Sequence, residues 1–87
     1  MKKRGPRPKP KTPDPSVVLL GKRIRSLRKA AGYTSHEAFA WEHGFARAQY
    51  LAYEHGRDLQ FSTLLRIVRA FNMSLNEFFE EGFEEND

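Results

Sequence analysis

The sequence holds 87 residues with a formal net charge of +4 and no cysteine, which is enough chain for one small domain with a limited core. The absence of cysteine excludes disulfides and thiolate metal sites, and it fits a reducing compartment. No apolar run approaches the roughly 20 residues of a membrane span, and no apolar stretch follows the basic start as it would in a secretion signal. We therefore expect a soluble, cytoplasmic protein with no membrane contact.

Charge is distributed unevenly along the chain. The net charge is +5 over residues 1–15, +5 over residues 16–76 and −6 over residues 77–87. The first segment contains all five prolines and six basic residues: Lys2, Lys3, Arg4, Arg7, Lys9 and Lys11. Because proline removes backbone donors and disfavours helix in the residue before it, we predict a disordered, extended basic arm.

An arm of this kind beside a basic domain favours contacts with phosphates, although a solubilising tail is the alternative. The acidic end is expected to screen charge or to solubilise the chain rather than to bind a ligand. We predict a flexible arm (1–15), a folded domain (16–80) and an acidic tail (81–87).

The first predicted helix follows the arm. Apolar residues recur at spacings of three and four, which is typical of one helix face: Val17, Leu20, Ile24, Leu27 and Ala31. Ser16 suits the N-cap and Gly32 suits a left-handed stop. The opposite face is basic, and we expect it to be mostly solvated: Lys22, Arg23, Arg25, Arg28 and Lys29.

Two short helices come next, separated by a single glycine. Either Thr34 or Ser35 caps the second helix, which runs to about His43. Gly44 ends it, and a third helix follows from Phe45 to about Glu54. Helices joined by about three residues must cross steeply, so a small residue and a turn glycine are needed at the crossing.

Two further helices complete the domain. The apolar spacing over residues 62–71 predicts a fourth helix, which Asn72 can close in a left-handed conformation. Ser74 and Glu77 have capping-box spacing before a short fifth helix. No stretch alternates with period two, so the sequence predicts an all-α fold, a compact five-helix bundle.

Residues 36–56, which contain the second and third predicted helices, resemble the Cro/repressor-type (XRE-like) helix-turn-helix family. If His36 takes the first place of that family's motif, Phe39 and Ala40 fall on its apolar and small positions, and Gly44 falls on the turn glycine. Inward positions of the second motif helix fall on three aromatic residues: Phe45, Tyr50 and Tyr53. The similarity extends over about sixty residues and includes three more segments: Leu19 to Gly32, Tyr53 to Gly56 and Ser62 to Phe79.

Several positions depart from the family pattern, and two of them bear on the third helix and on surface packing. Ala46 stands where Ser or Thr often caps the third helix, so that helix end should be slightly weakened. Trp41 falls on a position that is usually solvated, and we expect it to pack against the arm or the first helix rather than to contact a ligand.

The resemblance implies that the third helix (about 46–54) enters the major groove of double-stranded DNA with its N-terminal end first. At 100° per residue, Arg47, Ala48, Leu51 and Ala52 share its outer face. Arg47 alone offers the forked donors that select guanine, the alternative being a merely solvated side chain. Gln49 lies on the flank and suits a phosphate.

Further phosphate contacts are expected at the start of the second helix and after the third: Thr34, Ser35, His36 and Arg57. Arg28 and Lys29 are weaker candidates because basic helix faces are usually solvated. The resemblance also implies a weak homodimer through the C-terminal helix, for which Phe78 and Phe83 offer apolar surface. Leu75 and Phe79 are expected to complete the core.

These observations predict a sequence-specific DNA-binding transcriptional regulator, cytoplasmic and nucleoid-associated. It is expected to be no enzyme and to need no cofactor, metal or small-molecule ligand, since His36, His43 and His55 lack a metal-binding spacing. The main alternative is a helix-turn-helix-fold protein-interaction module, an antitoxin or adaptor, with little base readout. RNA binding is a third possibility, although no platform of paired aromatics is recognisable.

Overall fold

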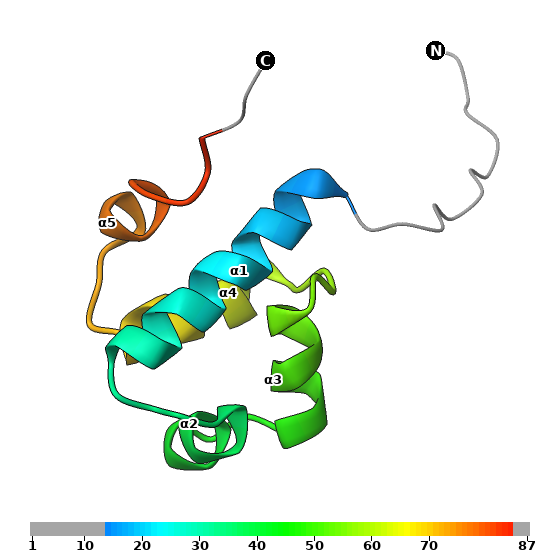
Figure 1. Cartoon of the computed structure of the whole chain (residues 1–87), viewed down its shortest axis with the longest axis vertical. Coiled ribbons are helices and arrows are strands. Elements are labelled where there is room, and N and C mark those ends of the chain that lie inside the picture. Colours follow the sequence, from blue (N-terminus) through cyan, green and yellow to red (C-terminus); the bar gives the residue numbers. More distant parts are fainter. Residues whose placement is uncertain (1–13, 85–87) are drawn as a thin grey trace, which may run out of the picture.

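The computed structural model describes residues 14–84, which fold into five helices (Figure 1). These are α1 (Pro15–Ala30), α2 (His36–His43), α3 (Arg47–Glu54), α4 (Phe61–Ala70) and α5 (Leu75–Phe79). No strand occurs within this part of the chain, and the predicted all-α five-helix bundle is confirmed. The basic residues of the predicted arm, Lys2 to Lys11, lie outside the described residues. No helix of residues 14–84 is both long and apolar enough to cross a membrane.

The N-terminal cap of α1 differs from the prediction. Asp14 has an extended backbone, and its Oδ1 accepts a hydrogen bond from the Ser16 amide at 2.8 Å. Pro15 then opens the helix at a position where its missing N–H has no intrahelical partner to lose. The assignment of Ser16 as the cap is therefore wrong, because the carboxylate two residues earlier takes that role.

The other helix ends follow local sequence rules. Ser35, not Thr34, caps α2, since its Oγ accepts the amide of the third helical residue at 3.1 Å. Ser74 and Glu77 form the expected capping box of α5. Asn72 closes α4 with a φ of 59°, the left-handed conformation that was predicted.

Helix α1 crosses in front of α4, while α3 lies to the right, α2 below and α5 to the upper left in the view of Figure 1. The core lies between these helices, and its largest fully buried side chains come from all five: Ile24, Phe39, Tyr50, Ile67, Val68 and Phe78. Phe39 sits at its aromatic centre, with its ring centroid 5.0 Å from that of Tyr50 and 4.9 Å from that of Phe71. Such tilted and stacked ring pairs stabilise the fold beyond the contribution of the apolar area that they bury.

Gly21 brings α1 and α3 into close backbone contact. A Cβ at this position would lie 2.6 Å from the carbonyl oxygen of Tyr53 and 2.7 Å from that of Glu54. No larger residue fits unless the helices separate, so the distance between α1 and the C-terminal end of α3 is fixed here by the absence of a side chain.

Two arginines of α1 are buried, so the basic face that was predicted to be mostly solvated is solvated only in part. Arg28 forms a two-point ion pair with Glu54 of α3, with Nε–Oε2 at 2.7 Å and Nη2–Oε1 at 3.2 Å. Arg23 donates to the carbonyl oxygens of Phe78 and Glu77 at 2.7 and 3.0 Å. The donors of both guanidinium groups find acceptors on other helices. Arg28 therefore connects α1 to α3, and Arg23 connects α1 to α5.

Candidate nucleic-acid interface

The candidate interface is built on α2, α3 and the three residues that join them. Gly44 ends α2 with a φ of 75°, which reverses the chain direction within one residue. Ala40 is buried at the crossing, so the small residue and the turn glycine occupy the positions expected for them. Phe45 follows the turn and packs against the core as a half-buried ring.

Helix α3 begins at Arg47 after Ala46, which has no side-chain hydrogen bond to the helix. Tyr50 is fully buried beneath the helix, and its orientation sets which residues face outward. Arg47 and Ala48 are exposed on the outer side, whereas Leu51 and Ala52 are only partly exposed. The exposed part of the predicted reading face is therefore its N-terminal half.

Arg47 is held by a residue of the neighbouring helix. Its Nη1 lies 3.2 Å from Oε2 of Glu37, in the first turn of α2. Both side chains are largely exposed, at 68% for Arg47 and 55% for Glu37. An exposed pair of this kind contributes little stability, so it orients the guanidinium and can open at little cost when a ligand arrives.

The ion pair between Arg47 and Glu37 brings the start of α2 close to the start of α3. Thr34 is exposed, while Ser35 and His36 are half-buried, and the Ser35 hydroxyl is already used as the cap. A helix start of this kind presents unpaired amides and the positive end of the helix dipole. Arg57 is exposed just after α3. These predicted phosphate-contact residues thus lie near the outer face of α3 or at its two ends.

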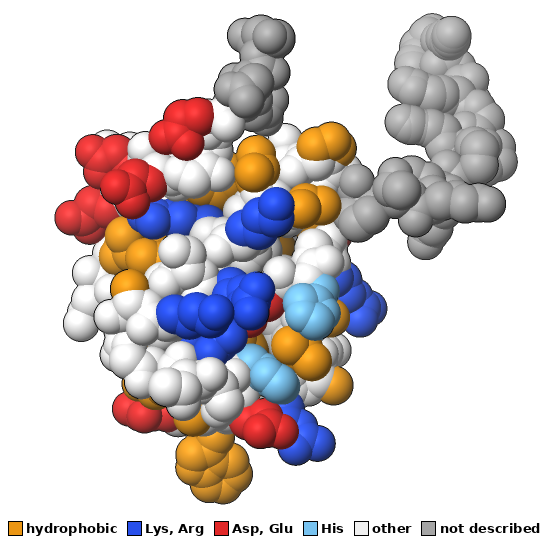
Figure 2. Space-filling view, in the orientation of Figure 1, with side chains coloured by type: hydrophobic (Ala, Val, Ile, Leu, Met, Phe, Trp, Pro, Cys, Tyr) orange, Lys and Arg blue, Asp and Glu red, His pale blue; other side chains and the backbone are white. Residues whose placement is uncertain are grey.

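Surface charge is separated in the same way as in the sequence. Lys and Arg side chains gather over α1 on the face shown in Figure 2, and acidic side chains gather beside α5. Lys22, Arg25 and Lys29 are exposed on α1. Of the two weaker phosphate candidates, only Lys29 is free to act, because Arg28 is buried in its ion pair with Glu54.

Three aromatic predictions need correction. Trp41 is 87% exposed, so it does not pack against α1, and the arm, its other predicted contact, lies outside the described residues. Phe78 is fully buried, because the α1 side chain of Arg23 and the core enclose it, and so it offers no surface for a dimer. Phe79 is instead 43% exposed, although it was expected to complete the core. Phe83 is half-buried, with its ring centroid 4.8 Å from that of Phe79.

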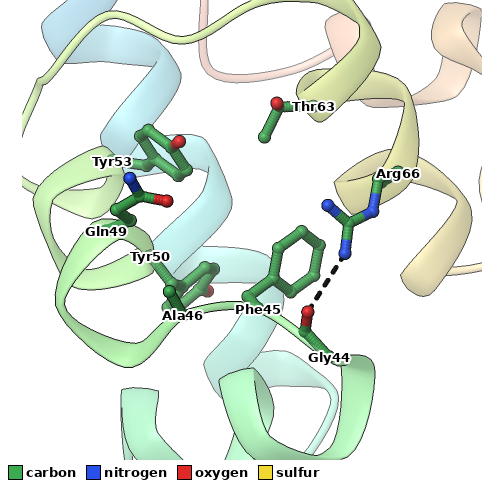
Figure 3. Close-up of a pocket in the computed structure, with 8 residues that line it drawn as sticks. All are labelled: Gly44, Phe45, Ala46, Gln49, Tyr50, Tyr53, Thr63 and Arg66. Carbon is green, nitrogen blue, oxygen red and sulfur yellow. Dashed lines mark hydrogen bonds between the residues drawn. The ribbon is translucent and has the colours of Figure 1, made fainter.

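A polar cleft that the sequence analysis missed lies between the turn and α4 (Figure 3). Arg66 of α4 donates from Nη2 to the Gly44 carbonyl oxygen at 3.2 Å, and its guanidinium carbon lies 4.4 Å from the centroid of the Phe45 ring. Gln49 and Thr63 line the same cleft, whose volume is about 80 Å³. Nothing in the local pattern around Arg66 indicates this contact, because it joins residues 22 positions apart.

Two buried ionisable groups support α3 from below. The hydrogen bond and charge of Glu54 raise the pKa of Arg28 above its usual value. Burial raises the pKa of the Tyr50 phenol, and the nearby Glu54 carboxylate adds to the rise. The Tyr50 hydroxyl is buried without a hydrogen-bond partner among the described residues. Neither group faces the outer side of α3, so their effect is on the fold rather than on a ligand.

This arrangement, a short helix held outward across a three-residue turn on a small helical domain, defines a helix-turn-helix protein. The profile of the family described as "Helix-turn-helix domain" matches residues 21–81. The crystal structure of the restriction-modification controller protein C.AhdI from Aeromonas hydrophila is similar, with 31% sequence identity and a TM-score of 0.65. The match covers 72% of this chain and 96% of that chain. A search of curated proteins found no match.

The chain belongs to the XRE-type helix-turn-helix family, and the resemblance inferred from its sequence is confirmed. It is a DNA-binding transcriptional regulator.

Proposed function

We propose that this regulator recognises a specific DNA sequence by placing α3 in the major groove, N-terminal end first. The observation that carries the proposal is the outer face of α3, where Arg47 and Ala48 are exposed beside the start of α2. Arg47 donates two hydrogen bonds to guanine O6 and N7, and the short side chain of Ala48 permits close approach to the base edges. Leu51 and Ala52 supply apolar contacts to thymine methyl groups.

The affinity comes mainly from backbone contacts, because a face with one forked donor reads few bases. The first amides of α2 and the side chains of Thr34 and His36 contact one backbone strand, and Arg57 adds a cation after α3. The six basic residues of the arm, Lys2 to Lys11, add phosphate contacts along the duplex.

The protein acts as a weak homodimer on a two-fold operator. The exposed ring of Phe79 and the half-buried ring of Phe83 support this proposal, since together they present apolar surface beyond α5. Phe79 thus replaces Phe78 in the predicted dimer contact. Sedimentation at high protein concentration, with and without operator DNA, measures the association. A monomer under both conditions contradicts it.

Similarity to a restriction-modification controller protein favours a role in which occupancy of the operator controls a neighbouring promoter. Such a protein works on the nucleoid in the cytoplasm. Selection of bound duplexes from a random pool identifies the operator and provides the probe for the tests below.

Arg47 is tested first. Arg47→Ala is expected to weaken binding to the selected duplex by about 1–3 kcal/mol and to relax selection at one base pair. Arg47→Lys keeps the charge but loses the planar fork, so it retains general affinity and loses discrimination. Equal discrimination by wild type and both variants would show that Arg47 reads no base.

Ala52→Glu separates groove reading from the alternative, a protein-interaction module for which the 87% exposed Trp41 is the favourable observation. The new carboxylate faces the phosphates of the groove and is expected to abolish DNA binding while the melting temperature stays near wild type. Ala30→Glu is the matched control, because Ala30 is exposed and lies about 200° around α1 from Arg28, which points to α3. If Ala52→Glu folds and binds DNA as wild type does, the interaction module becomes the better account.

A further inference from the structure

The cleft between the turn and α4 contains a cation that is oriented but not neutralised. One donor of the Arg66 guanidinium is used by the Gly44 carbonyl oxygen, and the plane rests on Phe45. Within residues 14–84, no carboxylate lies within ion-pair distance of Arg66. Arginine carries five N–H donors, so several remain for a ligand.

The remaining lining suits an anion. Figure 3 shows Arg66, Thr63 and Gln49 around one opening, and their guanidinium, hydroxyl and amide groups are all hydrogen-bond donors. The cleft, with a volume of about 80 Å³, is large enough to admit water or the oxygens of a phosphate group. Stacking on Phe45 also holds the guanidinium in place before any ligand arrives, which lowers the entropy lost on binding.

The position of the cleft relative to α3 indicates which strand of a bound duplex would face it. The Glu37–Arg47 contact places the start of α2 on the Arg47 side of α3. Counting Arg47 as 0°, Ala52 lies at about 140° and Gln49 at about 200°, so Gln49 is on the opposite flank of the outer face. A helix in the major groove has a phosphate backbone on each side of it.

We infer that the Arg66 cleft binds a backbone phosphate of the DNA strand opposite the one contacted by the start of α2. Arg66 provides the main contact, and Thr63 and Gln49 donate the additional hydrogen bonds. The inference rests on the proposed entry of α3 into the major groove. It adds α4 to the DNA-binding surface and fixes α3 between two backbone contacts, which determines how α3 is rotated in the groove.

The salt dependence of DNA binding tests this contact. Affinity for the selected duplex is measured by fluorescence anisotropy over a range of salt concentrations. Each phosphate contact contributes about −0.9 to the slope of log K against log salt, so Arg66→Gln should reduce the magnitude of the slope by about that amount. We also expect roughly tenfold weaker binding at physiological salt from loss of a charge-assisted hydrogen bond. Arg66→Lys should keep the wild-type slope.

Arg69→Gln is the matched control, because Arg69 is exposed on the same helix but does not line the cleft. Its slope is expected to equal that of wild type. If Arg66→Gln keeps both the slope and the affinity of wild type, the inference is overturned.

Thr63→Glu provides a second test in case Arg66→Gln loses stability along with its contact to Phe45. It places a carboxylate beside the cleft and leaves Arg66 intact, so binding should weaken at least tenfold; unchanged binding overturns the inference. Failure of the wild-type protein to bind any duplex would refute the proposed function and this inference together, whereas wild-type binding with unaffected cleft variants refutes the inference alone.

Discussion

The buried Arg28–Glu54 ion pair gives the sharpest test of how α3 is held in place. Its side chains are only 6% and 1% exposed, and two hydrogen bonds join them. The perturbation is Glu54→Gln, which keeps the shape of the side chain and removes its charge. The Arg28 guanidinium would then remain buried without its counter-ion.

Removing one partner of a buried ion pair costs about 3–5 kcal/mol. At about 0.05–0.15 kcal/mol per residue, the described residues 14–84 fold with about 4–11 kcal/mol in total. The loss is therefore a large share of the stability. Each kcal/mol lowers the melting temperature of a domain this size by about 4–8 °C, so Glu54→Gln should melt about 12–40 °C below wild type.

Thermal and urea unfolding followed by circular dichroism measure the change. The double variant Arg28→Met/Glu54→Leu is the control, because it leaves no unpaired charge; it should recover to within about 2 kcal/mol of wild type. A loss below about 1 kcal/mol in Glu54→Gln would refute the reasoning. The reasoning would also be refuted if the stability lost in the double variant equalled the sum of the losses in Arg28→Met and Glu54→Leu. This result would show that the two side chains act independently.

Three further outcomes are expected. Gly21→Ala should lower stability by about 1–3 kcal/mol, because its Cβ would meet the Tyr53 carbonyl oxygen at 2.6 Å; a wild-type melting temperature contradicts this. Tyr50→Phe should make alkaline destabilisation shallower. Burial raises the pKa of Tyr50, so its protonated form is favoured by folding, and the wild type loses that stability as the pH rises above about 10; equal pH profiles of unfolding free energy contradict the assignment. Deleting residues 1–13, which leaves the Asp14 cap, should weaken binding to all duplexes and flatten the salt slope; an unchanged slope would make the arm a passive tail.

Local chemistry explains most of the fold that could be predicted from the sequence. Capping residues act within three or four positions, so Ser74 with Glu77 and the left-handed Gly44 were recognisable without tertiary information. The same rules failed at Ser16, because two acceptors stood close together and Asp14 was the better placed of the two. Apolar spacing predicted the positions of the helices, but it did not show which of two neighbouring residues, such as Phe78 and Phe79, would be buried.

Long-range partners could not be predicted. The sequence around Arg28 is typical of a solvated helix face, and its partner Glu54 lies 26 positions away in the chain. The burial of Arg28 therefore could not be predicted from local sequence. Gly21 gives no local turn signal, because its role is to allow two backbones to approach. The Arg66 cleft needs the turn, α3 and α4 together. These features depend on the packing angle between helices, which periodicity does not encode.

The composition of the proposed interface determines how affinity and specificity are divided. Arg47 is the single forked donor on the outer face of α3, and its ion pair with Glu37 must open before it can reach a guanine. Because both side chains are largely exposed, opening the pair costs little, about 1 kcal/mol or less. In the proposed complex, the freed Glu37 carboxylate would lie beside the phosphate backbone, where it would oppose binding unless Arg47 gains a base contact. In the proposed complex, phosphate contacts at the start of α2 and at Arg66 would therefore supply affinity on any duplex, and Glu37 would subtract from it. A guanine opposite Arg47 would recover the affinity that Glu37 removes, whereas another base would not. A face with few donors could therefore still discriminate between sequences.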